Sequence, residues 1–195
     1  MPGESRQALL DRVVDHLTET GSAELSLRQL AAAVGSSHRM LLYHFGSADE
    51  LRQAVVLEVE ERMRTWFFAV ADSDQLSLSD LTFAMWKRVS AVELEGVVRL
   101  FFGLYVRLLE QQRNREITDL LVTRWLQPTV EFLTGRGVPA DRAGHLARLG
   151  IAASRGLLLD VLATGDREAA DAAARAYAAA LFPVDPPRLE TQESR

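Results

Sequence analysis

The sequence predicts an all-α protein, in which an amino-terminal three-helix helix-turn-helix domain is joined by a long helix to a larger helical domain. Three observations support this prediction. The alternating polar and apolar residues that are typical of strands are absent, and Ala, Leu, Arg and Glu dominate the chain. Apolar residues recur at helical spacing along almost its whole length. Two short runs of this kind, joined at Gly35, follow each other between residues 26 and 45.

Composition and charge narrow the class of protein. The chain has 195 residues, 48% hydrophobic and 25% charged, which is typical of a soluble globular protein with a substantial core. It contains no cysteine, which excludes disulfides, thiol catalysis and cysteine-ligated zinc. We see no signal peptide and no apolar stretch of about 18 residues, and therefore expect a cytoplasmic protein without a membrane partner. Because the formal net charge is −5, any binding of nucleic acid must depend on a local surface.

Three short helices are predicted in the amino-terminal domain, residues 1–47. The first covers residues 5–20, where leucines and valines recur at helical spacing until Gly21. Ser26 has the position of an N-cap, and Gln29, three residues later, completes a capping box for a second helix that ends near Val34. After the turn at Gly35, Ser37 caps a third helix that runs through about His44.

The remaining helices form the second domain, residues 48–182. A long helix over residues 48–71 has acidic residues in its first turn and one apolar stripe along its length. Five further helices are expected over residues 78–92, 93–112, 115–134, 139–164 and 166–181, separated by glycine- and proline-containing breaks. The proline-rich polar tail, residues 183–195, is expected to be disordered.

The pair of short helices around Gly35 has the dimensions of a helix-turn-helix. Ala31 is small where the helices approach, Val34 and Leu41 supply apolar contact, and Gly35 permits the turn. The exposed face of the second helix of the pair carries hydrogen-bonding groups, and such a helix can lie in the major groove of DNA. These groups belong to Ser37, His38, Arg39, Tyr43 and His44. The alternative is a solvated helix pair inside an all-helical bundle.

The same stretch, "SLRQLAAAVGSSHRMLLYHFGSADEL", resembles the DNA-binding domain of the TetR family of bacterial transcriptional regulators. The positions that fit the pattern of the family are Ser26, Leu30, Ala31, Gly35, Leu41, His44, Phe45 and Leu51. The resemblance implies a protein that binds double-stranded DNA, dimerises through its last two helices and responds to a small molecule. The DNA-binding residues expected here are Ser26, Arg28, Ser37, His38, Arg39, Tyr43 and His44.

Two positions depart from the family pattern. Leu42 stands where the family has a backbone-contacting tyrosine, with Tyr43 one place later, and Ala48 stands where the family has a lysine. Residues 1–47 contain four arginines and five acidic residues, a net charge of −1. Because phosphate contacts supply most non-specific affinity, we expect weak binding outside the cognate site. Histidines in this domain could make binding sensitive to pH.

Aromatic side chains from several helices of the second domain predict a cavity for a small hydrophobic or aromatic effector, of about 300 Å³ or more. A pair of arginines flanking Gly103, at i and i+8, could hold an anionic group. The candidate ligand-binding residues are Phe67, Trp86, Arg99, Phe102, Tyr105, Arg107 and Trp125. The alternatives are ordinary core packing for the aromatic residues and a solvated stripe for the arginines.

The helix expected over residues 139–164 has two apolar faces and therefore needs two covering surfaces, one of which is expected to be a second subunit. The Ala-rich last helix suits close packing. The candidate interface residues of a homodimer are Leu149, Ala153, Gly156, Leu157, Tyr177 and Leu181. Two recognition helices would also suit a palindromic operator.

Three functions remain open from the sequence. The first is a ligand-responsive transcriptional regulator, more specifically a repressor that its effector releases from DNA. The second is a helical enzyme or small-molecule-binding protein that retains the helix-turn-helix only as structure, and the third is a protein-interaction module. The sequence contains no Walker loop, HExxH, GxSxG or glycine-rich dinucleotide fingerprint, and no catalytic residue, metal site or cofactor is predicted.

Overall fold

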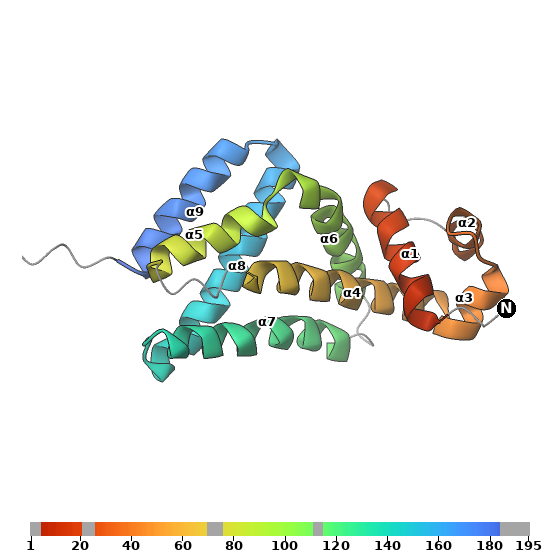
Figure 1. Cartoon of the computed structure of the whole chain (residues 1–195), viewed down its shortest axis with the longest axis horizontal. Coiled ribbons are helices and arrows are strands. Elements are labelled where there is room, and N and C mark those ends of the chain that lie inside the picture. Colours follow the sequence, from red (N-terminus) through yellow and green to blue (C-terminus); the bar gives the residue numbers. More distant parts are fainter. Residues whose placement is uncertain (1–4, 21–25, 70–75, 111–114, 184–195) are drawn as a thin grey trace, which may run out of the picture.

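The computed structural model describes residues 5–20, 26–69, 76–110 and 115–183, and almost all of them are helical (Figure 1). The amino-terminal helices are α1 (Arg6–Thr20), α2 (Leu27–Ala33) and α3 (His38–Phe45), followed by the long α4 (Ala48–Phe68). The body contains α5 (Leu78–Val89), the 3₁₀ helix η1 (Val92–Leu94), α6 (Glu95–Glu110), α7 (Arg115–Gly135), α8 (Ala140–Thr164) and α9 (Arg167–Leu181). Within these ranges no helix is long and apolar enough to cross a membrane.

The predicted all-α class is confirmed, and the helix boundaries differ from prediction by a few residues. The largest difference lies between α5 and α6, where one predicted junction near residue 92 becomes a capped end at Ser90 and a turn of 3₁₀ helix. Lys87 and Arg88 lie in the last turn of α5, where cations interact favourably with the helix dipole. Beyond Pro183, the tail predicted to be disordered lies outside the described residues.

The helix-turn-helix is built by local hydrogen bonds and a glycine turn. The Ser26 side chain accepts from the backbone N–H of Gln29, and the Gln29 side chain accepts from the backbone of Ser26, so the predicted capping box is formed. Ser37 caps α3 in the same way through the N–H of Met40, at 3.1 Å. Gly35 has φ 64°, a left-handed conformation that favours glycine.

Two arginines of α1 hold the ends of the other two short helices. Arg6 Nε donates to the carbonyl of His44 at 3.3 Å, and Arg12 Nε donates to the carbonyl of Val34 at 3.0 Å. Both carbonyls lie at helix carboxy-termini, where the backbone has free acceptors and a partial negative charge. Half of the arginines in residues 1–47 therefore brace the domain internally.

The long helix α4 connects the helix-turn-helix to the body. Arg62 lies near its middle and forms ion pairs with Asp15 at 2.7 Å, Asp11 at 3.3 Å and Glu58 at 3.1 Å, which join α4 to α1. The buried residues of the three amino-terminal helices, α4 and the body form one continuous hydrophobic cluster. The predicted domains thus share a core.

A second contact between the amino-terminal helices and the body lies at Gly96, in the first turn of α6. A Cβ atom at this position would stand 2.5 Å from the carbonyl oxygen of Thr18, near the end of α1. No side chain fits there without a shift of the backbone, and the glycine lets α6 touch α1 directly.

A buried carboxylate links α4 to α7. The Glu60 side chain is fully buried, 3.5 Å from Arg124 of α7 and 3.8 Å from Arg64 of its own helix. Burial raises the pKa of Glu60, because removal from water disfavours the charged form more than the two arginines favour it. Its neighbour Glu61 is more exposed, and a hydrogen bond from Arg64 lowers the pKa of that carboxyl.

We predict that Glu60→Gln raises the stability of the fold at neutral pH. Because the folded-state pKa of Glu60 is raised, its contribution to stability is present below the ordinary value of 4.5 and is lost as pH rises through the folded-state pKa. The uncharged glutamine avoids this loss. The melting temperature of Glu60→Gln should therefore exceed that of the wild type at neutral pH, and the difference between the two proteins should shrink as pH falls toward 4.5. Thermal unfolding across a pH series measures it.

Glu61→Gln is the matched control, since the pKa of Glu61 is shifted the opposite way. Its contribution to stability is present above the ordinary value and is lost as pH falls, so this variant should be slightly less stable at neutral pH. If both substitutions lower the melting temperature alike at neutral pH, the burial of Glu60 is not the dominant influence on its charge.

Candidate functional site

The helix α3 lies beside α2 at the end of the molecule away from α5 and α9 (Figure 1), and one of its faces is exposed. Tyr43 is 79% exposed and Leu42 is 36% exposed, although both are large apolar or aromatic residues. His38 and Arg39, in the first turn, are exposed beside them, and Ser37 is the exposed N-cap. This face offers donors, acceptors and an apolar side chain on one short rigid helix.

Two of the predicted DNA-binding residues are placed differently from Tyr43. The hydroxyl of Ser26 is occupied by the α2 cap, although the residue itself is exposed, as is Arg28. His44 is half-buried: its ring packs edge-on against Tyr43 and Phe45, and its Nε2 is buried without a hydrogen-bond partner. The prediction that His44 belongs to the exposed face is therefore wrong, because this position turns toward the core side of α3.

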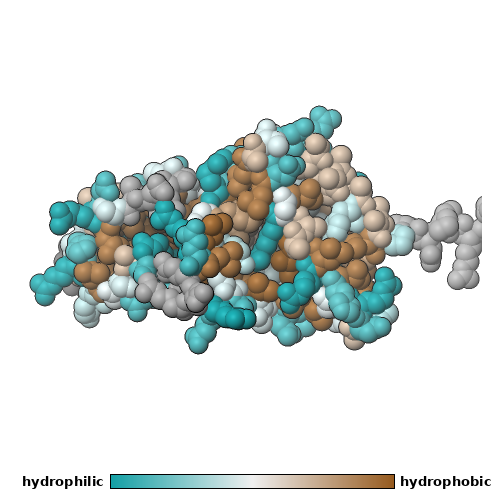
Figure 2. Space-filling view, turned by 180° about the vertical axis from the view of Figure 1, so that it is seen from behind, coloured by the Kyte–Doolittle hydropathy of each residue, from teal (hydrophilic) through white to brown (hydrophobic). Residues whose placement is uncertain are grey.

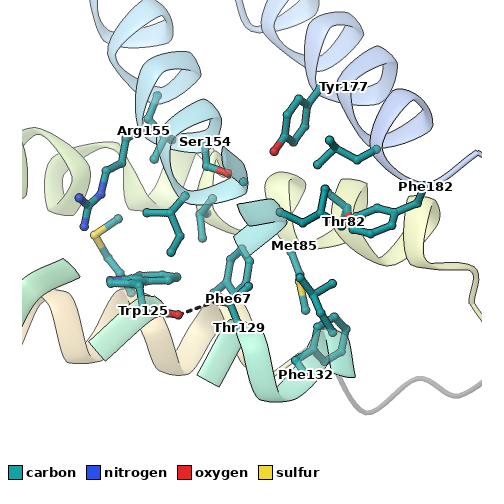
Figure 3. A pocket seen from close by; sticks show the side chains of 18 of the residues that line it. Phe67, Thr82, Met85, Trp125, Thr129, Phe132, Ser154, Arg155, Tyr177 and Phe182 are labelled. Carbon is teal, nitrogen blue, oxygen red and sulfur yellow. Dashed lines mark hydrogen bonds between the residues drawn. The ribbon is translucent and has the colours of Figure 1, made fainter. Parts of the chain in front are cut away.

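A cavity of about 90 Å³ lies in the body between α4, α5, α6, α7, α8 and α9 (Figure 3). Its walls are almost entirely apolar, and rings from four helices and Phe182 surround it. The aromatic lining residues are Phe67, Phe101, Phe102, Trp125, Phe132, Tyr177 and Phe182. The volume is smaller than the predicted 300 Å³, because these side chains fill the space between the helices. A drug-sized ligand would require them to move.

Three of the predicted ligand-binding residues, Phe67, Phe102 and Trp125, line this cavity. Phe67 and Trp125 meet edge-to-face with 5.2 Å between ring centroids, which joins α4 to α7 at the cavity wall. The prediction that aromatic residues from several helices converge on one space is confirmed for these three.

The other two aromatic candidates do not line the cavity. Trp86 is buried between α5 and α9, where its Nε1 donates to Asp171 at 2.8 Å. Partial burial raises the pKa of Asp171, but hydrogen bonds from Lys87 and Trp86 outweigh it and hold that pKa below its ordinary value. Tyr105 stacks on Phe101, behind the wall.

The predicted arginine pair lies on the outer side of α6, away from the cavity. Arg99 forms an ion pair with Glu95 at 3.0 Å near the surface. Arg107 lies one turn beyond Gly103, beside an open groove that Arg52 and Phe102 also border. Their spacing places both arginines on one face, as predicted, but that face is turned outward.

The polar residues of the cavity lining were not assigned to the ligand site from the sequence: Thr82, Thr129, Ser154, Arg155 and Tyr177. The Tyr177 hydroxyl is buried and has no hydrogen-bond partner among the described residues, and burial raises the pKa of Tyr177 to about 12. The Arg155 guanidinium lies 5.7 Å from the centroid of Phe101 and 5.3 Å from that of Tyr105, and it donates to the carbonyl of Leu121 at 3.4 Å. The sequence offered one signal that Arg155 could have a special role, since it is the only charged residue between Arg148 and Asp160.

The predicted dimer residues divide between two faces. Leu149, 49% exposed, and Gly156 lie on the outer surface of α8, and Ala153 and Leu157 are half-buried. Tyr177 and Leu181 point into the cavity and not outward. The two residues occupy the inner face of α9, whose outer face carries only smaller side chains near them.

The outward faces of α8 and α9 each carry a stripe of exposed apolar residues. On α8 the outer stripe consists of Leu149, Ala152, Gly156, Leu159 and Ala163. On α9 it consists of Ala169, Ala172, Ala173, Ala176 and Ala180. Figure 2 shows apolar residues gathered over the half of the molecule that contains these two helices.

Several solved structures share this arrangement of helices, and two of them are members of the TetR family. A TetR regulator from Legionella pneumophila superposes with a TM-score of 0.70 at 15% identity, over 93% of this chain and 100% of that one. A TetR-family member from Streptomyces coelicolor A3 gives a TM-score of 0.70 at 24% identity, over the same shares. The chain has the TetR fold. The resemblance seen in residues 26–51 is thereby confirmed for the architecture of the whole chain.

Another structure with the TetR fold is the multidrug binding protein EbrR in complex with malachite green. It is 26% identical to this chain, with a TM-score of 0.68 over 93% of this chain and 100% of that chain. No protein-family model and no curated relative matches the sequence. The TetR fold is therefore carried by the arrangement of helices, while the sequences have diverged widely.

The unpaired hydroxyl of Tyr177 leads to a prediction about stability. A buried hydroxyl without a partner costs free energy, so Tyr177→Phe should raise the free energy of unfolding by up to about 1 kcal/mol. Trp86→Phe is the contrasting variant. It removes the donor to Asp171 and should lower the free energy of unfolding by about 2 kcal/mol. Urea denaturation measures both. A clear loss of stability in Tyr177→Phe would mean that the hydroxyl is hydrogen-bonded.

Proposed function

We propose that this protein is a cytoplasmic, homodimeric transcriptional regulator that binds a palindromic operator and is released from it by a small apolar or aromatic effector, and thus acts as a repressor. The observation that carries the proposal is the continuity of α4. Ser47 caps α4 directly after the exposed α3, and Met63 and Phe67 of the same helix line the cavity. One rigid element therefore connects a surface suited to DNA with a space suited to a ligand.

The chemistry of the α3 face supports reading of base edges. An arginine such as Arg39 can donate two hydrogen bonds to guanine, and an apolar side chain such as Leu42 can contact the methyl group of thymine. His38 and Tyr43 add groups that can donate or accept. Arg28, exposed on α2, is suited to a phosphate.

Residues 1–47 contain only four basic side chains, and two of them, Arg6 and Arg12, use their Nε to hold carbonyls of the domain. The helix amino-terminus at Ala48 presents free N–H groups without the lysine of the family pattern. We therefore expect modest affinity for unrelated DNA and a strong dependence on base contacts.

A small-molecule effector is supported by the cavity and by the comparisons. EbrR has been crystallised with imidazole and with malachite green, and this chain shares its fold. A ligand that pushes on Phe67 would move α4, which Arg62 ties to α1, and one that pushes on Phe102 would move α6, which meets α1 at Gly96. Both routes end at the helix-turn-helix.

Dimerisation is supported by the two outer stripes. Small residues on α9 and apolar residues on α8 permit close packing of four helices from two subunits. Two half-sites of an operator need two recognition helices, which a dimer supplies. The alternative, an enzyme or carrier that keeps the helix-turn-helix only as structure, predicts no selective retention of DNA in a gel shift.

We predict that Arg39→Ala and Tyr43→Ala weaken binding to a duplex selected from a random pool by about 1–3 kcal/mol each, with less effect on a scrambled duplex. Ala48→Lys should strengthen binding to both duplexes alike and steepen the slope of log K against log salt by roughly one unit, because it adds one phosphate contact. Fluorescence anisotropy over a salt series measures all three variants.

The outcomes separate base reading from backbone positioning. An equal loss on both duplexes for Arg39→Ala would make this arginine a positioning residue. An unchanged salt slope for Ala48→Lys would mean that α4 does not reach the backbone. If none of the three variants alters binding, α3 is not the DNA-binding helix.

We predict that Leu159→Arg converts the dimer to a folded monomer. Leu159 is 47% exposed in the outer stripe, so a charge there is solvated in the monomer but buried without a partner at the proposed interface. Val92→Arg is the control, because Val92 is exposed in η1, outside both stripes. Sedimentation of the wild type, Leu159→Arg and Val92→Arg at equal concentration measures the oligomeric state of each. A dimeric Leu159→Arg would place the interface elsewhere, and a monomeric wild type would contradict the proposed assembly.

A further inference from the structure

We propose that the cavity selects a compact aromatic carboxylate that carries a second polar group, with Arg155 binding the carboxylate and the Tyr177 hydroxyl binding the second group. This inference rests on the ligand-responsive part of the proposed function and names the chemical class of the effector. It depends on three features of the cavity: the sign of its charge, its unpaired polar groups and its size.

The charge of the lining is positive. Among the described residues that line the cavity there is no aspartate or glutamate, and Arg155 is the one charged side chain. A cationic ligand would lose its hydration and meet no carboxylate, whereas an anion would meet a guanidinium. Glu60, the buried carboxylate of α4, lies outside the lining and beside Arg64 and Arg124.

Arg155 has no carboxylate partner within the part of the chain that the structure describes. Its guanidinium is held by the rings of Phe101 and Tyr105 and by a long hydrogen bond to the Leu121 carbonyl. These contacts fix its position and leave its charge uncompensated. In Figure 3 the guanidinium lies on the same side of the cavity as the Trp125 ring. An arginine placed in this way suits a planar carboxylate next to an aromatic ring.

The Tyr177 hydroxyl is a second unsatisfied group at another side of the cavity, and Ser154 lies between it and Arg155 (Figure 3). With a pKa of about 12 it stays protonated at physiological pH and can both donate and accept a hydrogen bond. Gly150 lies next to this hydroxyl, since a Cβ there would be in ordinary van der Waals contact with the hydroxyl oxygen, at 3.5 Å. A buried hydroxyl without a partner gains a hydrogen bond when a ligand supplies one.

The walls and volume limit the rest of the ligand. About 90 Å³ enclosed by aromatic rings suits a single ring with short substituents and excludes a large ligand without rearrangement. Rings that meet edge-to-face, such as Phe67 and Trp125, offer edges and faces to a flat apolar body.

The first experiment compares three probes of nearly equal shape: benzoate, benzamide and benzamidine. They carry a negative, a neutral and a positive group on the same ring. Calorimetric titration of the wild type should give affinities in the order benzoate, benzamide, benzamidine. Arg155→Met should weaken benzoate about ten- to hundredfold, the loss of a hydrogen bond to a charged group, and leave benzamide almost unchanged.

The control is Arg148→Met, which removes an exposed arginine from the same helix and should leave all three affinities as they are. If Arg155 only holds α8 against its neighbours, Arg155→Met will weaken the three probes equally, and the proposal fails. It also fails if benzamidine binds as tightly as benzoate, or if none of the three probes binds.

The second experiment tests Tyr177 with the ortho, meta and para isomers of hydroxybenzoate. At least one isomer should bind the wild type several-fold more tightly than benzoate, and Tyr177→Phe should remove this gain without weakening benzoate itself. Tyr43→Phe, on the exposed face of α3 and far from the cavity, is the control. If no isomer gains over benzoate, or the gain survives in Tyr177→Phe, the hydroxyl does not bind the ligand.

A gel shift with the selected duplex, with and without the tightest probe, separates this inference from the proposed function. Selective carboxylate binding without any DNA binding would support the ligand class and contradict the regulator. DNA binding without carboxylate binding would support the DNA-binding part and contradict the ligand class.

Discussion

The structure depends on one constraint: α4 is a single helix that packs into two regions at once. Its amino-terminal half buries Leu51 and Val55 beneath the helix-turn-helix, and its carboxy-terminal half places Met63 and Phe67 in the cavity wall. A helix without proline, glycine or an inserted group does not kink readily, and α4 contains no proline or glycine. The positions of the two ends of α4 are therefore coupled. The ion pairs of Arg62 with Asp11 and Asp15 also join α4 to α1, so a shift of α4 would shift the amino-terminal domain as well.

The use of arginine in the amino-terminal domain sets the character of its surface. Arg6 and Arg12 satisfy carbonyls at the ends of α3 and α2, so they stabilise a very small domain at the cost of phosphate contacts. Arg28 and Arg39 are the arginines of residues 26–47 that reach the surface. A domain with a net charge of −1 has no long-range attraction for DNA, so the proposed binding depends on short-range hydrogen bonds and shape.

The helix α8 has two faces with different surroundings. Its inner face carries Arg155 and Ser154 to the cavity, while its outer face carries Leu149 and Leu159 to the surface. A ligand on the inner face and a second subunit on the outer face would act on the same rigid helix. The relative position of the two helix-turn-helix domains in a dimer would then depend on the occupancy of the cavity.

The sequence by itself determined the all-α class, the helix-turn-helix and the helix boundaries to within a few residues, because caps, glycine turns and apolar spacing act within a few residues along the chain. The capping box of Ser26 and the left-handed Gly35 are where the pattern predicted them. Only the tertiary structure decided which helix covers each face. Periodicity shows that residues share a face but not what lies opposite that face. For this reason Tyr177 lines the cavity and not a surface, His44 turns inward, and the cavity cation is Arg155 of α8 and not an arginine of α6.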